Sequence, residues 1–490
     1  MNSHLSDILL DRKSSIPLYV QLSNAIGRRI ENGQIPPRTK LPGSRKLSQE
    51  LGLHRQTVVE AYSELHQQGF IVMEPKRGSF VNSSIPKLGP QEFGSSAGTS
   101  FNIGSMINPH HYLEIPVIQQ VPGLQIDEGL PDLRLSPIQE IRRDYAAILS
   151  KPSNMKLLGY QSPRGNQHLI EELTKYFEET RGLKLGNDGL MITRGSQMGL
   201  YLAASLLLEK GDRVVVGELN YQTANITFIH HGASLIHVPV DEFGIEVDAL
   251  EAICKEDQIK MIYVTSHHHH PTTGTLSVER RVRLLQLAEQ YNFVILEDDY
   301  DYDFHYERSP LMPLKSADYS GRVIYVGGIS KNIAPGLRIG FLVAPSLLIT
   351  KAEYLRRVMD RQGDHVMEQV IANMFRSGDY HRFAKKVLKT YGLRRDAFIE
   401  KLIRIQEFSF GKPLGGLAIW AGLDQKISLE VLSKKLKSLG LLIPRWQNYD
   451  PQLTGHNHIR LGFASLNEEE LELVFNKVHE AMDYLRLQTS

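Results

Sequence analysis

From about residue 123 onward, short apolar runs alternate with segments of helical periodicity. The runs are GLMIT, DRVVVG, SLIHVPV, KMIYVTS, FVILED, RVIYVGG and GFLVAP. Both odd and even positions of each run are apolar, so we expect both faces of each strand to be covered. Such strands separated by helices are typical of a largely parallel sheet in an α/β domain. The sequence therefore predicts a doubly covered α/β body over residues 123–490.

The pattern changes toward the carboxyl end of this body. Long helical segments span residues 351–407, and mixed segments and a final helix follow. This order predicts a smaller α+β subdomain from about residue 375. A chain of 490 residues also exceeds what one hydrophobic core usually serves, so a multidomain protein is expected.

The first 81 residues have a different organisation. An amphipathic helix is predicted over residues 17–33, and two shorter helices over residues 45–52 and 55–69 are separated by a three-residue break. Two short strand-like pieces, FIVMEP and GSFV, come next. Helix, helix-turn-helix and hairpin is the order of a winged helix-turn-helix domain, an α+β fold. Residues 82–122 are rich in Ser, Gly, Pro and Asn, and we interpret them as a linker.

Charge is unevenly divided between these regions. The whole chain has a net charge of +1, whereas residues 1–81 carry eleven Lys or Arg and seven Asp or Glu, a net of +4. A basic head on a near-neutral body favours a DNA-binding module. Cys254 is the only cysteine, which excludes an intrachain disulfide. The amino-terminal segment lacks a signal-peptide pattern, and no run is long and apolar enough for a membrane span, so we expect a cytoplasmic protein without membrane contact.

The second helix of a helix-turn-helix presents its first residues to DNA bases in the major groove. The positions that would do so here, or would contact the DNA backbone, are Arg45, His54, Arg55, Gln56, Thr57, Arg77 and Gly78. Arg pairs with guanine and Gln with adenine, whereas Arg45 and the hairpin tip suit phosphate or the minor groove. The alternative is a helical interaction domain whose polar face is merely solvated. Residues 17–81 closely resemble the GntR family of winged helices, which implies double-stranded operator DNA as a partner; that family's usual Ser is His54 here.

In two sequence segments of the body, a reactive side chain comes at or just after the end of a predicted strand. Lys331 follows a strand in VIYVGGISKNIAPGLRIGF, next to Ser330 and seven residues before Arg338. In FVILEDDYDYDF, a strand delivers Asp298 and its acidic neighbours to its carboxyl end, where open α/β sheets bind ligands. Taken singly, the lysine reads as a surface residue and the carboxylates as a metal-binding or solvated cluster. Side chains alternate between the two faces of a strand, but the sequence does not give the register of this strand in the sheet. It therefore leaves open which of Asp298 and Asp299 faces a ligand.

Two further sequence segments could bind parts of a ligand, one an anionic group and the other an aromatic ring. In ITRGSQMGLYLAASLLL, Gly195 permits a tight turn before Ser196 and Gln197 open a helix, whose free N–H groups bind phosphate. Tyr221 follows a strand in GELNYQTAN and is a candidate for stacking on a ring. An ordinary helix cap and an ordinary packing aromatic are the alternatives.

In their order along the chain, these four sequence segments resemble those of fold-type I aminotransferases, and the resemblance covers residues 123–485. The resemblance implies pyridoxal 5'-phosphate (PLP) bound as an aldimine on Lys331, with Asp298 opposite the pyridine nitrogen and Tyr300 donating to the phenolate oxygen. It assigns the phosphate to Ser196, Gln197, Ser330 and Arg338, and ring stacking to Tyr221. Arg460, in HIRLGFASL, would bind the carboxylate of an effector. Tyr160, in YQSPRG, matches the tyrosine that such dimers lend to the neighbouring subunit, which implies a homodimer.

A GntR-type head on an aminotransferase-like body is the architecture of the MocR regulators, with the GabR-type proteins as a branch. The loop VTSHHHHPTTGTLSVERR is similar to these regulators' own version. The resemblance implies a PLP-dependent transcription regulator that senses an amine, an amino acid or PLP itself, and a domain-swapped homodimer. The alternative is an active aminotransferase with an appended DNA-binding domain, or a residual transamination half-reaction.

Three positions depart from the enzyme pattern. Gly328 stands where the family often has Thr or Ser, Thr223 stands where a GABA-sensing relative has Arg, and His270 stands where true aminotransferases have Asn. The last change predicts ring electronics less suited to efficient transamination. The four adjacent histidines could suggest a metal site, but neighbouring histidines on one loop seldom converge on one ion, so no metal is expected.

Overall fold

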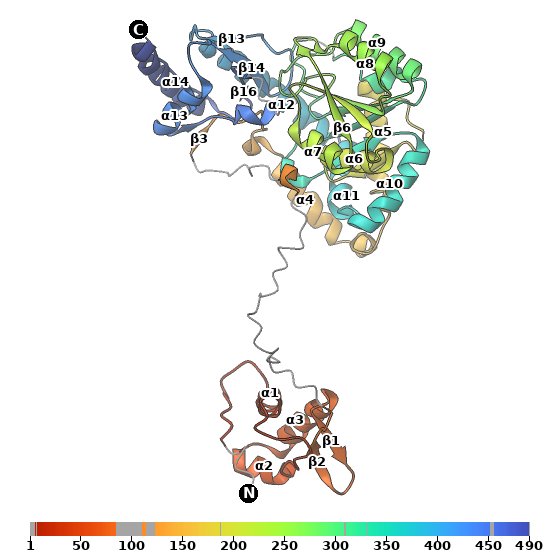
Figure 1. Cartoon of the computed structure of the whole chain (residues 1–490), viewed down its shortest axis with the longest axis vertical. Coiled ribbons are helices and arrows are strands. Elements are labelled where there is room, and N and C mark those ends of the chain that lie inside the picture. Colours follow the sequence, from red (N-terminus) through yellow and green to blue (C-terminus); the bar gives the residue numbers. More distant parts are fainter. Residues whose placement is uncertain are drawn as a thin grey trace. The chain divides into compact units, whose positions relative to one another are not determined.

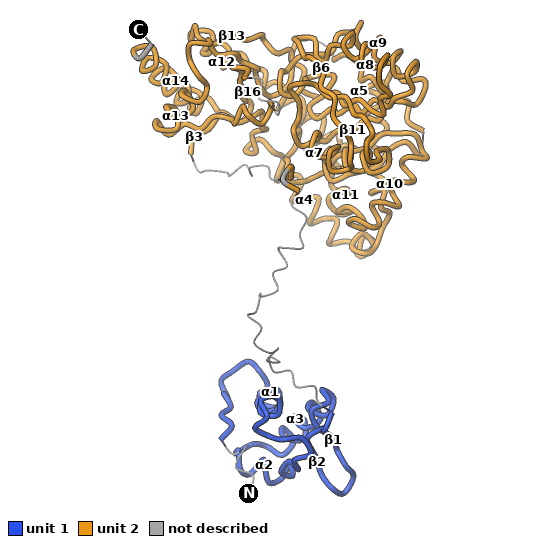
Figure 2. Tube along the Cα trace, in the orientation of Figure 1, with its two compact units in different colours: residues 1–109 blue, residues 110–490 orange. Residues whose placement is uncertain are grey.

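The computed structural model describes residues 5, 7–84, 110–113, 123–186, 188–307, 310–329, 331–450 and 455–489. The chain divides into two compact units, residues 1–109 and residues 110–490 (Figures 1 and 2). Most of the predicted linker, residues 82–122, and the predicted phosphate ligand Ser330 lie outside the described residues.

The first unit has the predicted order of elements. Its helices are α1 (Leu18–Glu31), α2 (Ser44–Leu51) and α3 (Arg55–Gln67), and its strands β1 (Ile71–Glu74) and β2 (Gly78–Val81) form an antiparallel hairpin. Leu22 and Ile26 of α1, Leu47 of α2 and Val58 and Leu65 of α3 are buried together, because each helix has its apolar residues at helical spacing. Gly52 ends α2 in a left-handed conformation, which permits the sharp turn into α3.

The second unit is built on a seven-stranded sheet. In spatial order the strands are β4 (Leu190–Thr193), β12 (Gly340–Val343), β11 (Val323–Gly328), β10 (Val294–Asp299), β9 (Met261–Val264), β5 (Arg213–Gly217) and β6 (Ser234–Val238). Strand β12 is antiparallel to both neighbours, whereas the pairs from β11 to β6 are parallel. The largely parallel sheet predicted from the apolar runs is confirmed.

Helices cover both faces of this sheet. Leu296 and Val326 pack under α6 (Ser196–Leu207), α7 (Gln222–His230) and α10 (Ser346–Met359). Ile295 and Tyr325 face the opposite helices, which are α5 (Gln167–Arg181), α8 (Val247–Glu256), α9 (Val278–Tyr291) and α11 (His365–Arg376). Burial on both sides is the reason that these strands are apolar at successive positions. The remaining short elements are α4 (Ile138–Leu149), η2 (His111–Leu113), η3 (Leu133–Leu135), η4 (Pro152–Leu158), η5 (Leu314–Ala317), η6 (Pro335–Leu337), β7 (Val240–Asp241) and β8 (Gly244–Ile245).

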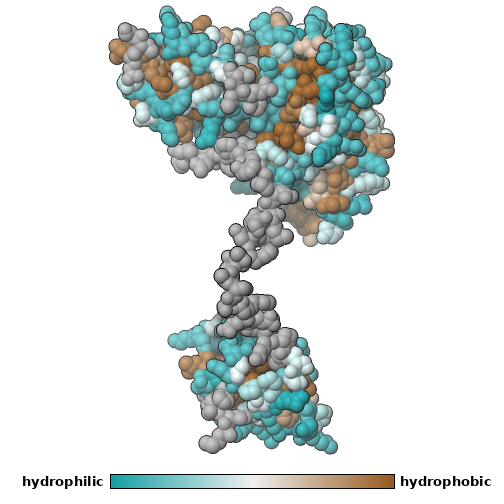
Figure 3. All heavy atoms as spheres, viewed as in Figure 1, coloured by the Kyte–Doolittle hydropathy of each residue, from teal (hydrophilic) through white to brown (hydrophobic). Residues whose placement is uncertain are grey.

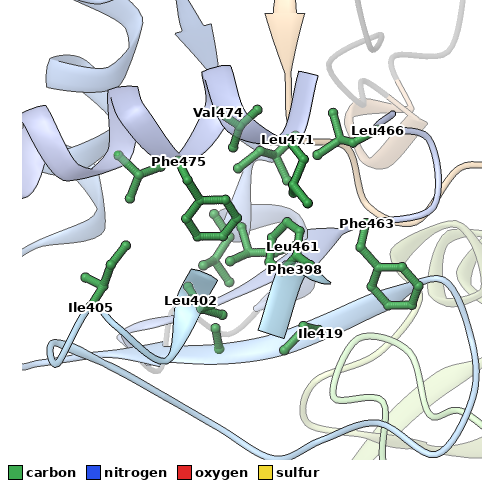
Figure 4. Close-up of a cluster of buried hydrophobic side chains, with 14 of the residues drawn as sticks. Phe398, Leu402, Ile405, Ile419, Leu461, Phe463, Leu466, Leu471, Val474 and Phe475 are labelled. Atoms are coloured by element: carbon green, nitrogen blue, oxygen red, sulfur yellow. The ribbon is translucent and has the colours of Figure 1, made fainter. Parts of the chain in front are cut away.

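A smaller α+β layer follows α11. It holds the antiparallel strands β13 (Phe408–Phe410), β14 (Ala418–Leu423) and β16 (His458–Gly462), with α12 (Asp379–Leu402), α13 (Leu429–Ser438), α14 (Glu468–Thr489), β15 (Leu441–Leu442) and η7 (Trp446–Tyr449). Phe398, Leu461 and Phe475 lie in its core (Figure 4). Strand β3 (Leu124–Gln125) pairs with β15, so the beginning of the body joins this carboxyl-terminal layer.

Hydrophilic residues cover most of the face of each unit that Figure 3 shows. Among the described residues, no helix is both long enough and apolar enough to cross a membrane.

Candidate functional site

Strand β10 ends in two aspartates that point to opposite faces of the sheet. Asp298 shares the face of Leu296, which α6 and α7 cover, because side chains alternate along a strand. The Tyr263 hydroxyl donates a 3.0 Å hydrogen bond to Oδ2 of Asp298, while the buried Oδ1 has no hydrogen-bond partner. Burial raises the pKa of Asp298 to about 7. This carboxylate therefore has one oxygen available for a donor on the helix side.

Asp299 has a different environment. It accepts a 2.8 Å hydrogen bond from Tyr325 and lies 3.1 Å from Nδ1 of His267. Burial opposes its ionisation, but the contacts with His267 and the charge of Arg181 outweigh burial and lower the pKa of Asp299. Asp299 is thus held as an anion on the face of the sheet opposite to Asp298.

Lys331 lies just beyond β11, the strand next to β10. Its Nζ is 4.3 Å from the centre of the Tyr300 ring. Burial lowers the pKa of Lys331, although the negative charges of Asp301 and Asp298 act in the opposite direction. A buried amine with a lowered pKa is more often unprotonated and therefore more nucleophilic.

The amino end of α6, where the sequence predicts an anion site, lies close to Arg338. Gly195 precedes Ser196 with φ of 76°, and a Cβ there would lie 2.6 Å from Nη2 of Arg338. Arg338 Nη2 also donates a 3.0 Å hydrogen bond to the Arg194 carbonyl. A Cβ at Gly340 would overlap the backbone of Gly195, and one at Gly328 would lie 3.8 Å from the Ser196 nitrogen. Because these glycines have no side chains, the Arg338 guanidinium can lie next to the backbone N–H groups at the start of α6.

Gln197 and Tyr221 lie beside this anion site. Gln197 Nε2 donates a 2.9 Å hydrogen bond to Thr227 of α7, and its buried Oε1 has no hydrogen-bond partner. Tyr221 is the N-cap residue of α7, and its hydroxyl lies beside Thr223. Its ring packs edge-on against His270 with centres 5.4 Å apart. The predicted stacking residue also lies close enough to Asp298 for that carboxylate to raise the pKa of its hydroxyl.

Arg460, on β16, reaches this space from the small layer. It is 1% exposed, and it donates from Nε to the Glu128 carbonyl at 2.9 Å and from Nη1 to the Pro271 carbonyl at 2.9 Å. Its Nη2 lies 3.4 Å from the Tyr300 hydroxyl, which itself donates to the His268 carbonyl at 2.7 Å. A guanidinium has five N–H donors, and these three hydrogen bonds leave two of them for another acceptor. The donation from Tyr300 to a cofactor stays a prediction.

His270 lies half-buried between three aromatic rings. Their centres lie 5.4 Å (Tyr221), 6.3 Å (Tyr300) and 5.8 Å (Tyr449) from the imidazole. Burial and the charges of Arg460 and Lys331 hold the pKa of His270 well below its ordinary value, so the ring is neutral. Its Nδ1 is buried without a hydrogen-bond partner. His270 thus presents a neutral imidazole to the site.

The other histidines of the run have partners of their own. His268 Nδ1 lies 2.8 Å from Asp301, and His269 Nδ1 lies 2.9 Å from the Thr272 hydroxyl. Within the described ranges, no group of three or more His, Cys, Asp or Glu side chains is arranged to hold a metal ion.

Tyr160 lies at the surface of the second unit. It is 81% exposed, and the Arg361 guanidinium lies 4.8 Å from its ring. Leu158, Arg194 and Asp360 line an open depression beside it. An exposed aromatic ring in such a depression is available to a second subunit.

The predicted DNA contacts gather on the first unit. Arg55 and Gln56 begin α3 and are exposed, and His54 caps the helix by accepting a 3.3 Å hydrogen bond from the Gln56 nitrogen. His54 thereby caps α3 as Ser residues commonly do at helix starts. Thr57 is half-buried, whereas Arg45 on α2 is exposed. Arg77 pairs with Glu74 at 2.5 Å beside Gly78 on the hairpin.

Sequence reasoning missed three residues of this site, namely Tyr263, Glu128 and Tyr449. Tyr263 pairs in register with Leu296, so its face could be found only after the strand order was known. Glu128 and Tyr449 come from segments with no periodic pattern, and both lie close to Arg460.

Two family models match the chain. The model described as aminotransferase class I and II matches residues 131–478, and the model described as bacterial regulatory proteins, gntR family, matches residues 18–81. Among solved structures, the multiple substrate aminotransferase from Thermococcus profundus superposes with a TM-score of 0.71 at 26% identity, covering 78% of this chain and 100% of that one.

Two relatives match along nearly the full length. The HTH-type transcriptional regulator TauR of Rhodobacter capsulatus is 28% identical over 92% of this chain and 93% of its own length. The probable rhizopine catabolism regulatory protein MocR of Rhizobium meliloti is 24% identical over 99% of this chain and 97% of its own. The chain therefore belongs to the aminotransferase class I and II family and, with its gntR-family DNA-binding domain, is a transcription regulator of the MocR type.

Proposed function

We propose that this regulator binds PLP at Lys331 and uses it to sense an amine or an amino acid, or PLP itself. The observation that carries the proposal is the meeting of three groups on one side of the sheet. These are the amine of Lys331, the unpartnered oxygen of Asp298 and the anion site at the start of α6.

The residues fit this cofactor. The unpartnered Oδ1 of Asp298 suits a protonated pyridine nitrogen, whose positive charge would keep the carboxylate ionised despite burial. Because Gly195 has no side chain, the Arg338 guanidinium packs against it at the start of α6, where a cation and helix N–H groups suit a phosphate group. When bound, PLP supplies an aldehyde that reacts with primary amines.

Each remaining side chain has a proposed role. We assign binding of the phosphate to Ser196, Gln197, Ser330, Arg338 and, from the neighbouring subunit, Tyr160. Tyr221 and Tyr300 would contact the cofactor ring. Arg460 would bind the carboxylate of the effector. Arg460 suits this role because the hydrogen bonds of its guanidinium go to neutral oxygens, which leaves two of its N–H donors for a carboxylate.

His270 favours sensing over turnover. It presents a neutral imidazole of low pKa beside Tyr221 and Lys331, where an aminotransferase has an amide donor. The second candidate function is an aminotransferase with an attached DNA-binding domain. It is supported by Lys331 and Asp298, which catalysis would also require. Repeated turnover with a keto-acid acceptor would favour that function.

Sensing requires a second state with different affinity for DNA. An effector that binds one arrangement of the body more tightly shifts the population toward it, and the DNA-binding units respond. We propose a homodimer, domain-swapped as in MocR-type proteins, acting on operator DNA in the cytoplasm. Exposed apolar side chains next to the depression, including Leu158, Met155 and Val358, support a subunit interface around Tyr160.

The test uses the full chain loaded with PLP. We expect a visible absorbance band that Lys331→Ala abolishes, and amines that shift the band to change the affinity for an operator selected from random-sequence DNA. A chain that retains the band after Lys331→Ala would contradict the assignment. Amines that shift the band without any effect on DNA affinity would contradict sensing.

A further inference from the structure

Glu128 brings a second charge to the effector site. Its carbonyl oxygen accepts the 2.9 Å hydrogen bond from Nε of Arg460. Its half-buried side chain lies beside the Tyr449 hydroxyl and faces the charges of Arg460 and Lys331. None of the proposed roles toward the cofactor uses this carboxyl group.

The turn that carries Glu128 is held firmly. Asp127 Oδ1 accepts hydrogen bonds from the backbone nitrogens of Gly129 at 2.7 Å and Leu130 at 2.8 Å. Asp127 Oδ2 accepts a 2.5 Å hydrogen bond from the Ser465 hydroxyl. Hydrogen bonds from Gly129, Leu130 and Ser465 to Asp127 therefore fix the backbone on which Glu128 sits, so its position beside Arg460 is built into the fold.

The surroundings of Glu128 are buried and aromatic. Tyr449 is 1% exposed, and its ring centre lies 5.8 Å from those of both His270 and Trp420. Charges interact more strongly in such surroundings than in water. A carboxylate here would therefore interact strongly with the charge of a bound ligand.

The balance of charges indicates the class of effector. Arg460 suits one carboxylate, and a second anionic group on the effector would meet Glu128 and be repelled. Asp301, the other carboxylate facing Arg460, is already paired with His268 at 2.8 Å. A second amine on the effector would instead find the Glu128 carboxylate as a partner. Burial raises the pKa of Glu128, and an ammonium group beside it would lower that pKa again.

We infer that Glu128 selects effectors that carry a second ammonium group besides the reacting amine and the carboxylate, as an α,ω-diamino acid does. The inference rests on the proposed function, because the reacting amine must reach a cofactor held at Lys331. It adds to that function the chemical class of the effector and the residue that recognises it.

The experiment titrates the PLP-loaded full chain with matched pairs of amino acids and follows the absorbance of the bound cofactor. The pairs are 2,4-diaminobutyrate with 2-aminobutyrate, ornithine with norvaline, and lysine with norleucine; glutamate is the dianionic comparison. We expect the best diamino acid to bind about tenfold or more tightly than its uncharged partner, the usual range for a hydrogen bond to a charged group.

Glu128→Gln should bring the ratio within each pair close to one and strengthen the response to glutamate. Glu289→Gln, an exposed change on α9, is the matched control and should leave the ratios unchanged. No preference for diamino acids in the parent chain, or a preference that survives Glu128→Gln, would overturn the inference. A missing cofactor band would instead overturn the proposed function, so the two failures are distinguishable.

Discussion

Tyr263 donates a 3.0 Å hydrogen bond to one oxygen of Asp298 and leaves the other oxygen buried without a hydrogen-bond partner. The tyrosine orients the carboxyl group, which lies close enough to Lys331 for the charge of that lysine to lower its pKa. This arrangement carries a cost in the ligand-free chain, since a buried charge without a full set of partners is unfavourable.

That cost predicts a pH dependence. Burial raises the pKa of Asp298 to about 7 from 3.8, so the folded ligand-free chain keeps a proton that the unfolded chain releases. The stability from this proton is complete below about pH 4 and is lost as the pH rises through about 7. Urea unfolding of the ligand-free chain should therefore show the parent losing stability relative to Asp298→Asn between about pH 4 and about pH 7. A difference that does not vary with pH would contradict the burial of this group.

Gly340→Ala should disturb the anion site. The new Cβ would overlap the backbone of Gly195, so the start of α6 must move away from Arg338. Overpacking of this kind costs about 1–3 kcal/mol, and we also expect weaker retention of PLP in equilibrium dialysis. Gly186→Ala is the control, because nothing lies within 4 Å of a Cβ there. Equal PLP affinity in both variants would argue against an anion site at α6.

Tyr160 offers a test of a shared site. Because its ring is 81% exposed in one chain, we expect Tyr160→Phe to weaken PLP binding only through the neighbouring subunit. A mixed dimer of Tyr160→Phe and Lys331→Ala chains should regain one full-affinity site, measured by absorbance, whereas neither variant alone should. Failure of the mixture to recover any site would show that Tyr160 does not act across subunits.

Arg460→Lys should keep the charge and lose the two-pronged geometry of the guanidinium. We expect the absorbance of the bound cofactor to remain and the response to amino acids to weaken by about tenfold, because bidentate hydrogen bonds to a carboxylate are lost. The response to amines without a carboxylate should be unaffected. A parallel loss for both kinds of ligand would place the carboxylate site elsewhere.

Arg55→Ala tests the first unit. Its exposed guanidinium begins α3, so its loss should weaken specific operator binding by roughly 1–3 kcal/mol. Arg28→Ala, an exposed change on α1, should have a smaller effect that does not depend on the DNA sequence. Unchanged footprints for Arg55→Ala would contradict the assignment of α3 as the recognition helix.

The sequence by itself determined the elements and the order of the motifs. Apolar residues at helical spacing predicted α1 and α3 with Arg55 at a helix start, and apolar runs predicted the strands that end beside Asp298 and Lys331. These features are local, because spacing and turn residues decide them within a few positions of the chain.

Only the tertiary structure decided how distant residues meet. The register of β9 against β10 brought Tyr263 to Asp298 and so distinguished it from Asp299. Packing of β16 against the turn after β3 brought Arg460 to Glu128, 332 positions away. No periodic pattern encodes such pairs, because they depend on how complete layers pack against one another and on which side chains the packing leaves facing the same space.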